Sequence, residues 1–122
     1  MFVSALYIEE LPEGKKRLTL PLIYVDVDNK ATIVPLGFIT DYASVPKTPL
    51  LYLLFSGVAD RSSTLHDFLY SSKATARADA DSLFLAAMLE EKTPRWKAHA
   101  MYYAVRLFGK AVRAKAYGIN HE

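Results

Sequence analysis

The order of hydrophobic and polar positions divides the chain into a β-rich N-terminal part and a helical remainder. Up to residue 40, short apolar runs rich in β-branched, aromatic and leucine residues alternate with turn residues. Asp28-Asn29-Lys30 is typical of a hairpin turn, and Pro12-Glu13-Gly14 marks an earlier turn. The runs predict a small antiparallel β-meander, with strands at residues 2–8, 17–20, 22–27 and 31–34.

Residues 38–46 have no helical period and are expected to form a proline-punctuated loop. After this loop the apolar residues recur at helical spacing. We expect a short helix at 48–55 and longer helices from Asp60 or Ser62 to Ser72, from 76 to 91 and from 94 to about 117. Thr75 and Thr93 are the expected N-caps of the last two, and Gly118 is the expected stop. The fold class is therefore α+β, an N-terminal antiparallel β-meander (1–40) followed by three to four helices (41–122) in a single domain, 1–122.

Composition supports one folded domain and excludes several kinds of site. Hydrophobic residues make up 52% of the 122 residues and charged residues 23%, which excludes a disordered chain. There is no cysteine, so disulfides, thiolate metal sites and cysteine nucleophiles are excluded. The longest apolar run, Pro49 to Val58, is about half of what a membrane span requires, and no segment has the pattern of a signal peptide. We therefore expect no transmembrane segment.

The net charge of +2 conceals an uneven distribution along the chain. Residues 1–91 have a balance of −4, whereas residues 92–122 carry 7 Lys/Arg against 1 acidic residue. The whole-chain charge argues against a dedicated nucleic-acid binder, while the C-terminal third leaves nucleic acid open as a partner.

The last predicted helix has two distinct faces. An apolar set at 3-4 spacing is expected to face the core: Ala98, Met101, Tyr102, Val105, Phe108 and Val112. Trp96, near the helix start, is expected to be a packing anchor; the alternative is a stacking platform. A second set, which we call the basic stripe, consists of His99, Tyr103, Arg106, Lys110, Arg113 and Tyr117. Arg106, Lys110 and Arg113 are candidate partner-binding residues for an acidic protein, an anionic membrane or nucleic acid; the alternative is a solvated helix face.

The segment 65–70 holds the candidate catalytic residues. On a helix His66 and Tyr70 share one face, and Asp67 lies about 100° round from His66. The next helix carries Asp81, which can face His66 across a short connector and orient its imidazole. Histidine is the side chain best suited to proton transfer near neutral pH. These positions predict a polar site with His66, Asp81 and Tyr70 as catalytic residues.

Two further readings of these residues stay open. Asp67 and Asp41, in the loop before the helices, are candidate ligands for a divalent metal ion such as calcium or zinc; for Asp41 the alternative is a local turn. The whole cluster could instead be a buried polar network that fixes helix packing, and Arg77 and Asp81, four residues apart, could be a surface ion pair. A hydrolase requires an open cleft at His66, whereas a packing network does not.

Several spaced motifs resemble a family of small phage and prophage proteins of unknown function. They run in one order from about Gly37 to Gly109 and end in the stretch 101–109. The family usually has glycine at the position of Tyr42. The resemblance implies a phage origin, and hence the host cytoplasm or the virion as location. The motifs are T-D-x-A-S-V-P at 40–46, L-H-D-x-L-Y at 65–70 and R-x-x-A-D-x-x-F at 77–84.

A looser, local similarity concerns mechanism. His66-Asp67-x-x-Tyr70 with the later Asp81 is similar to the catalytic helix pair of secreted phospholipase A2 enzymes. That similarity implies that His66 activates water, Asp67 binds calcium, and Tyr70 with Asp81 orients His66. The glycine-rich calcium loop and the stapling cysteines of those enzymes are absent from this chain.

Two classes of function follow from these observations. The first is a phage-encoded metal-assisted hydrolase with His66 as general base. The second is a non-catalytic virion or tail-assembly component, or a protein that binds a host factor. It would contact phage structural proteins or a host protein through the basic stripe or through Pro49–Val58.

Overall fold

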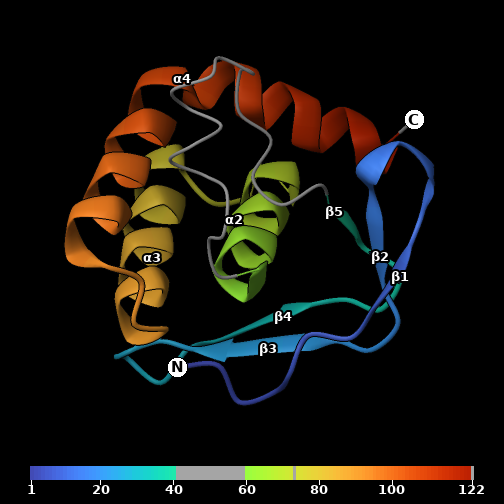
Figure 1. Cartoon of the computed structure of the whole chain (residues 1–122), viewed down its shortest axis with the longest axis horizontal. Coiled ribbons are helices and arrows are strands. Elements are labelled where there is room, and N and C mark those ends of the chain that lie inside the picture. Colours follow the sequence, from blue (N-terminus) through green and yellow to red (C-terminus); the bar gives the residue numbers. More distant parts are fainter. Residues whose placement is uncertain (41–59, 73, 122) are drawn as a thin grey trace.

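The α+β class is confirmed by the structure, a computed structural model that describes residues 1–40, 60–72 and 74–121. In Figure 1 the strands lie below and to one side of three main helices. The predicted helix at 48–55, the Pro49–Val58 segment and Asp41 lie outside the described residues. The elements are β1 (Ile8–Glu10), β2 (Lys16–Leu18), β3 (Leu22–Val25), β4 (Ala31–Val34), β5 (Ile39–Thr40), α2 (Asp60–Ser72), α3 (Arg77–Glu90) and α4 (Arg95–His121).

The β3–β4 hairpin forms where the turn chemistry predicts it. The strands pair antiparallel from Leu22↔Val34 to Val25↔Ala31. In the turn, the Asp26 carboxylate accepts hydrogen bonds from the backbone N–H groups of Asp28 (2.9 Å) and Lys30 (3.0 Å). This side chain satisfies the N–H groups that a tight turn leaves without a ladder partner.

The strands pair antiparallel as expected, and they are divided between two sheets, β1-β2-β5 and β3-β4. After β4 the chain turns at Gly37, which has a φ of 89°, and β5 pairs with β2 through Lys16↔Thr40. Beside this pairing, the Leu18 N–H donates to the Phe38 carbonyl at 2.9 Å. The β3–β4 hairpin is therefore an insertion between two strands of the other sheet.

The predicted strand at 2–8 is wrong in its extent, since β1 begins only at Ile8. The preceding residues run beside β3, where Phe2 bridges Tyr24 and the Val3 N–H donates to the Ile23 carbonyl. The Ile23 N–H donates to the Ser4 hydroxyl at 2.9 Å. A side chain thus accepts a bond that a regular ladder would give to a backbone carbonyl, and the regular strand is interrupted.

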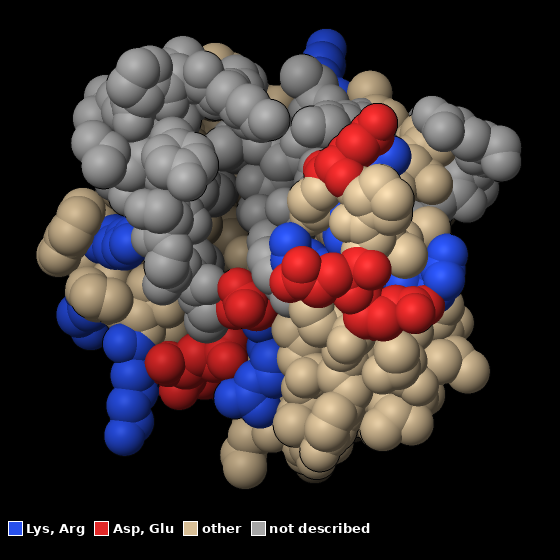
Figure 2. All heavy atoms as spheres, turned by 45° about the vertical axis from the view of Figure 1, so that its right-hand side comes forward, with Lys and Arg blue, Asp and Glu red and all other residues tan. Residues whose placement is uncertain are grey.

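Acidic and basic side chains are intermixed on the face of β1 and β2, which comes forward in Figure 2. Arg17 on β2 pairs with Glu9 on β1 at 2.7 Å, and both side chains are about half exposed. The acidic excess of the N-terminal part is thus partly neutralised locally by ion pairs between neighbouring strands.

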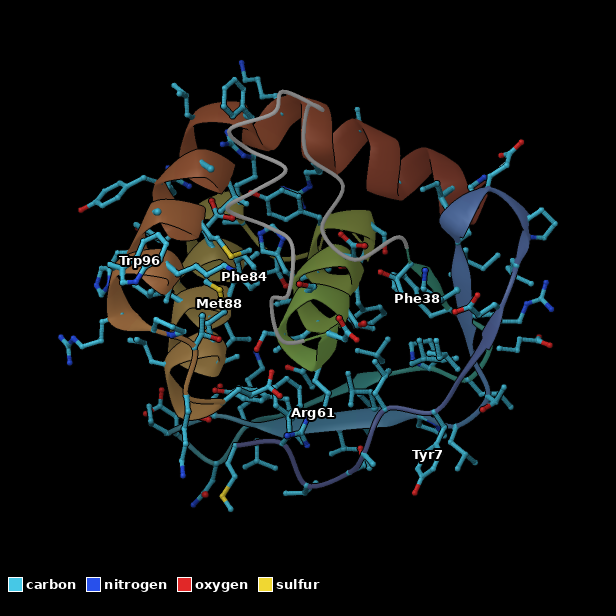
Figure 3. The ribbon with its side chains drawn as sticks, viewed as in Figure 1. Tyr7, Phe38, Arg61, Phe84, Met88 and Trp96 are labelled. Carbon is cyan, nitrogen blue, oxygen red and sulfur yellow. The ribbon has the colours of Figure 1, made fainter. Side chains whose placement is uncertain are left out.

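The helices enclose the core on the inner side of the strands. The α2 residues Leu65 and Tyr70 are fully buried, and Phe84 and Met88 of α3 pack against α4. Figure 3 shows Phe84 and Met88 among the helices. Of the predicted apolar face of α4, Ala98, Met101 and Val105 are fully buried, which confirms that face. None of the described helices has the length and hydropathy needed to cross a membrane.

Several predicted helix details are wrong. Trp96 is 68% exposed rather than a packing anchor, because it lies on the side of α4 away from the buried residues. The N-cap of α3 is Ala76, without a side-chain cap bond, so Thr75 does not cap it. The helix α4 begins at Arg95 and continues through the predicted stop at Gly118 to His121.

Candidate functional site

The centre of the candidate site is a buried pair between α2 and α3. Nε2 of His66 lies 2.8 Å from Oδ1 of Asp81, and both side chains have no exposed surface. Their helices pack directly against each other, so the expected juxtaposition of the two residues is present. The His66 ring is also stacked on Phe84, with 4.4 Å between the ring centroids.

Asp81 receives hydrogen bonds from three different side chains. Besides His66, the Tyr70 hydroxyl donates to Oδ1, and Nη1 of Arg106 donates to Oδ2 at 2.9 Å. Arg106 comes from α4, so the carboxylate joins all three main helices. A buried carboxylate is stable only with such partners, because burial alone strongly disfavours its charge.

The directions in which the pKa values of His66 and Asp81 are shifted indicate how the pair is protonated. Burial lowers the pKa of His66 below 6.5, although its bond to Asp81 acts in the opposite sense. Burial would raise the pKa of Asp81, but the hydrogen bonds from His66, Tyr70 and Arg106 outweigh it and hold that pKa below 3.8. Burial and Asp81 together raise the pKa of Tyr70.

It follows that a neutral His66 donates its Nε2–H to an ionised Asp81, which leaves the lone pair on Nδ1. This Nδ1 atom is buried and has no hydrogen-bond partner in the part of the chain that the structure describes. Buried polar atoms without a partner are uncommon in folded proteins, and a catalytic role is one of their known explanations.

Asp67 lies on the same helix turn as His66 but serves a different contact. It is 2% exposed, and the Thr40 hydroxyl donates to its Oδ2 at 2.5 Å. Thr40 ends β5, so this bond ties the β1-β2-β5 sheet to α2. The described residues contain no group of three His, Cys, Asp or Glu side chains that could hold a metal ion. Asp67 alone does not complete the predicted metal site, and Asp41, the other predicted ligand, lies outside the described residues.

The three candidate partner-binding residues have different surroundings. Lys110 is exposed, whereas Arg106 turns toward Asp81 with its side chain 37% exposed. Arg113 turns toward the end of α2, where Nε donates to the Tyr70 carbonyl (3.2 Å) and Nη2 to the Thr75 carbonyl (2.7 Å). Cations commonly satisfy the last carbonyls of a helix in this way.

The interpretation of Arg77 and Asp81 as a surface ion pair is wrong, because Asp81 is fully buried. Nη2 of Arg77 donates instead to the Arg106 carbonyl at 2.9 Å. In Figure 1 α4 changes direction along its length, with one part beside α3 and the other running toward the C-terminus. A side chain bonded to a helix carbonyl is a known cause of helix bending.

Comparison with known proteins identifies the family of the chain. The family described as "Protein of unknown function (DUF1353)" matches residues 16–105. The chain belongs to this family. The matched part of the DUF1353 chain includes β2 to β5, α2, α3 and the first part of α4, and therefore His66 and Asp81, while Arg106 is the first residue beyond it.

A more distant relative has a much longer chain. The DUF1353 chain is 30% identical over 105 residues to the "Uncharacterized protein y4jT" of Sinorhizobium fredii (strain NBRC 101917 / NGR234). The match covers 84% of this chain and 31% of that protein, so the chain spans about a third of its relative. No solved structure matches the chain.

Two residues of the site were not predicted in their observed roles. Arg106 is predicted to bind a partner, and the sequence does not predict Thr40 as a hydrogen-bond donor to Asp67. Both belong to motifs of the resemblance, Arg106 to the stretch 101–109 and Thr40 to the one at 40–46. Their place inside these motifs is the sequence feature that could have marked Arg106 and Thr40 as site residues. Their hydrogen-bond partners could not be predicted, because they depend on packing between distant segments.

Proposed function

We propose that this protein is a phage-encoded hydrolase in which His66 is the general base. The observation that carries the proposal is the fully buried His66, whose Nε2 is held by Asp81 at 2.8 Å and whose Nδ1 has no partner among the described residues. The resemblance of the motifs to small phage and prophage proteins supports a phage origin and a location in the host cytoplasm or the virion.

In the proposed reaction, Nδ1 of His66 takes a proton from a water molecule. The water oxygen attacks the carbonyl carbon of an ester or amide, or the phosphorus of a phosphoryl group, and the imidazolium returns the proton to the leaving group. Asp81 stabilises the imidazolium and keeps the Nε2–H tautomer. Tyr70 and Arg106 hold the Asp81 carboxylate in position. The local similarity to the phospholipase A2 helix pair supports the same roles for His66, Tyr70 and Asp81.

Asp67 would be a ligand if a calcium or zinc ion takes part. One of its oxygens already accepts a hydrogen bond from Thr40. The described residues do not group three metal ligands, and Asp41, the second predicted ligand, lies outside them.

Burial of the site favours a second function, a non-catalytic virion or tail-assembly component or a host-factor-binding protein. A substrate must reach a catalytic base, and we expected an open cleft at His66, yet this side chain has no exposed surface. In this second function, the bonds of Asp81 to His66, Tyr70 and Arg106 hold α2, α3 and α4 together.

Hydrolysis rates and circular dichroism, measured on the same variants, distinguish the two functions. Hydrolysis of p-nitrophenyl acetate, p-nitrophenyl butyrate and bis(p-nitrophenyl) phosphate is measured with calcium, zinc or EDTA for the wild type, His66→Gln and Tyr7→Phe. The hydrolase predicts a rate lower by about 10²–10⁴-fold in His66→Gln at unchanged circular dichroism. Tyr7 is exposed, and Figure 3 shows it well apart from Phe84, which stacks on His66, so Tyr7→Phe is the control with an unchanged rate.

Diethylpyrocarbonate labelling followed by peptide mapping tests access to Nδ1. A hydrolase predicts that His66 is modified in the folded protein. A wild type without activity on all three substrates, together with an unmodified His66, contradicts the hydrolase and supports the non-catalytic function.

A further inference from the structure

The outward face of α4 carries three large apolar side chains that the core does not use. Trp96, Tyr103 and Leu107 are 68%, 66% and 76% exposed. Because they are seven and four residues apart, they fall within about 40° of one another around the helix and extend over about 16 Å. The buried residues Ala98 and Val105 are on the opposite side of the same helix. Figure 3 shows Trp96 on α4, away from the interior residues Phe84 and Met88.

This face is flanked by positive charge. The helix α4 contains six Lys and Arg residues and no Asp or Glu, and two of them, Arg106 and Arg113, turn toward Asp81 and the end of α2. Arg95 and Lys110 are exposed near the two ends of the apolar row. The face of β1 and β2, by contrast, mixes both signs of charge (Figure 2).

An open groove of about 430 Å³ adjoins the row. Its α3 side is lined by Ser82, Leu85, Ala86 and Leu89, and its α4 side by His99, Tyr102 and Tyr103. Tyr103 therefore belongs both to the groove and to the exposed row. The groove extends the apolar surface sideways from α4 onto α3.

We propose that this outer face of α4 is a docking surface for an anionic phospholipid bilayer. Helices that lie in a membrane interface combine aromatic and leucine side chains with Lys and Arg beside them. The aromatic rings of Trp96 and Tyr103 suit the headgroup level, Leu107 enters the acyl region, and the basic residues meet the lipid phosphates. The surface is independent of the His66–Asp81 pair. A nucleic-acid groove would use aromatic stacking and cations but has no use for an exposed leucine.

The protein has one tryptophan beside 8 tyrosines, so fluorescence excited selectively at tryptophan reports on Trp96 alone. The whole chain is titrated with vesicles of equimolar phosphatidylglycerol and phosphatidylcholine, and with vesicles of phosphatidylcholine only. The expected result is a blue shift of the emission and co-sedimentation with the anionic vesicles, weakened by added salt. The proposal is overturned by an emission unchanged with anionic vesicles, by equal binding to neutral vesicles, or by tighter binding to a single-stranded oligonucleotide.

Matched variants locate the surface. Leu107→Ser lowers the partition coefficient roughly tenfold, and Lys110→Ala lowers it about fivefold. Val27→Ser and Ile33→Ser remove apolar side chains that are 90% and 55% exposed on the β3–β4 side, and they leave binding unchanged. Equal loss in these two controls, or full binding by Leu107→Ser, overturns the assignment to α4.

Discussion

The guanidinium of Arg77 lies against Gly109. Arg77 is the first residue of α3, and its Nη2 donates to the Arg106 carbonyl on α4 at 2.9 Å. A Cβ atom at position 109 would be 2.2 Å from Nη2 and 2.5 Å from Nε of Arg77. Only a glycine leaves room for this contact. The same Arg106 whose carbonyl binds Arg77 binds Asp81 with its side chain, so the contact supports the candidate site.

Gly109→Ala is therefore expected to change the free energy of unfolding in opposite directions, depending on whether Arg77 is present. In the wild type it displaces Arg77 and destabilises the protein by about 1 kcal/mol, despite the better helix propensity of alanine. In an Arg77→Ala background the same change stabilises the protein by about 1 kcal/mol, because only the propensity remains. Chemical denaturation of the four proteins measures this double-mutant cycle. The same sign in both backgrounds would contradict the contact.

Stability is expected to fall as the pH falls below 6.5, because of His66. Its pKa is lowered by burial, so between 6.5 and the folded pKa the unfolded chain binds a proton that the folded protein does not. The free energy of unfolding then decreases by up to about 1.4 kcal/mol per pH unit. Denaturation at a series of pH values measures the slope. His66→Gln loses this part of the slope, while the control His99→Gln keeps it; a slope unchanged in His66→Gln would contradict the assignment.

A second loss of stability is expected at lower pH from Asp81. Its folded pKa is held below 3.8, so its contribution is complete above that value and disappears as the pH falls through the folded pKa. Asp81→Asn removes this acid-dependent part and destabilises the protein at pH 7 by about 3 kcal/mol. Glu10→Gln, at an exposed position, is the control both at pH 7 and in the acid range. An Asp81→Asn protein as stable as the wild type at pH 7 would show that the network is not structural.

Thr40→Val tests the link between sheet and helix. The change keeps the shape of the side chain but removes the 2.5 Å hydrogen bond to the buried Asp67 carboxylate. The expected loss is about 2 kcal/mol in the free energy of unfolding, since hydrogen bonds to charged groups are stronger than neutral ones. Thr32→Val, on the partly buried β4 position, should change stability by less than about 0.5 kcal/mol. Equal effects at the two positions would argue against the bond.

Glu91→Gln tests how the residue after α3 stabilises the start of α2. The Glu91 carboxylate accepts hydrogen bonds from the Ser62 N–H (3.1 Å), the Ser62 hydroxyl (2.5 Å) and Nε of Arg61 (2.9 Å). A negative charge at a helix N-terminus is favourable, so its removal should cost about 1–2 kcal/mol. The effect should persist in high salt, because the Glu91 side chain is only 11% exposed. Complete loss of the effect in salt would indicate an ordinary surface ion pair.

The sequence by itself determined the elements whose cause is local. The hairpin turn after β3 follows from Asp26 and Asn29, and the apolar spacing of α4 predicts its buried face. The juxtaposition of His66 and Asp81 was also predictable, because a short connector between two helices brings their facing residues together. The first two features depend on residues close together in the sequence, and the third depends on the short connector between α2 and α3, so the spacing along the chain determines all three.

Only the tertiary structure decided which distant groups complete these contacts. The return of β5 to β2 across a hairpin, the bond from Thr40 to Asp67 and the bond from Arg106 to Asp81 join residues that are 24, 27 and 25 positions apart. Periodicity identifies the face of a helix but not what packs against it. A buried carboxylate accepts whichever donors the packing of α2, α3 and α4 brings within reach, so Arg106 binds Asp81 although its position in the sequence indicated a surface stripe.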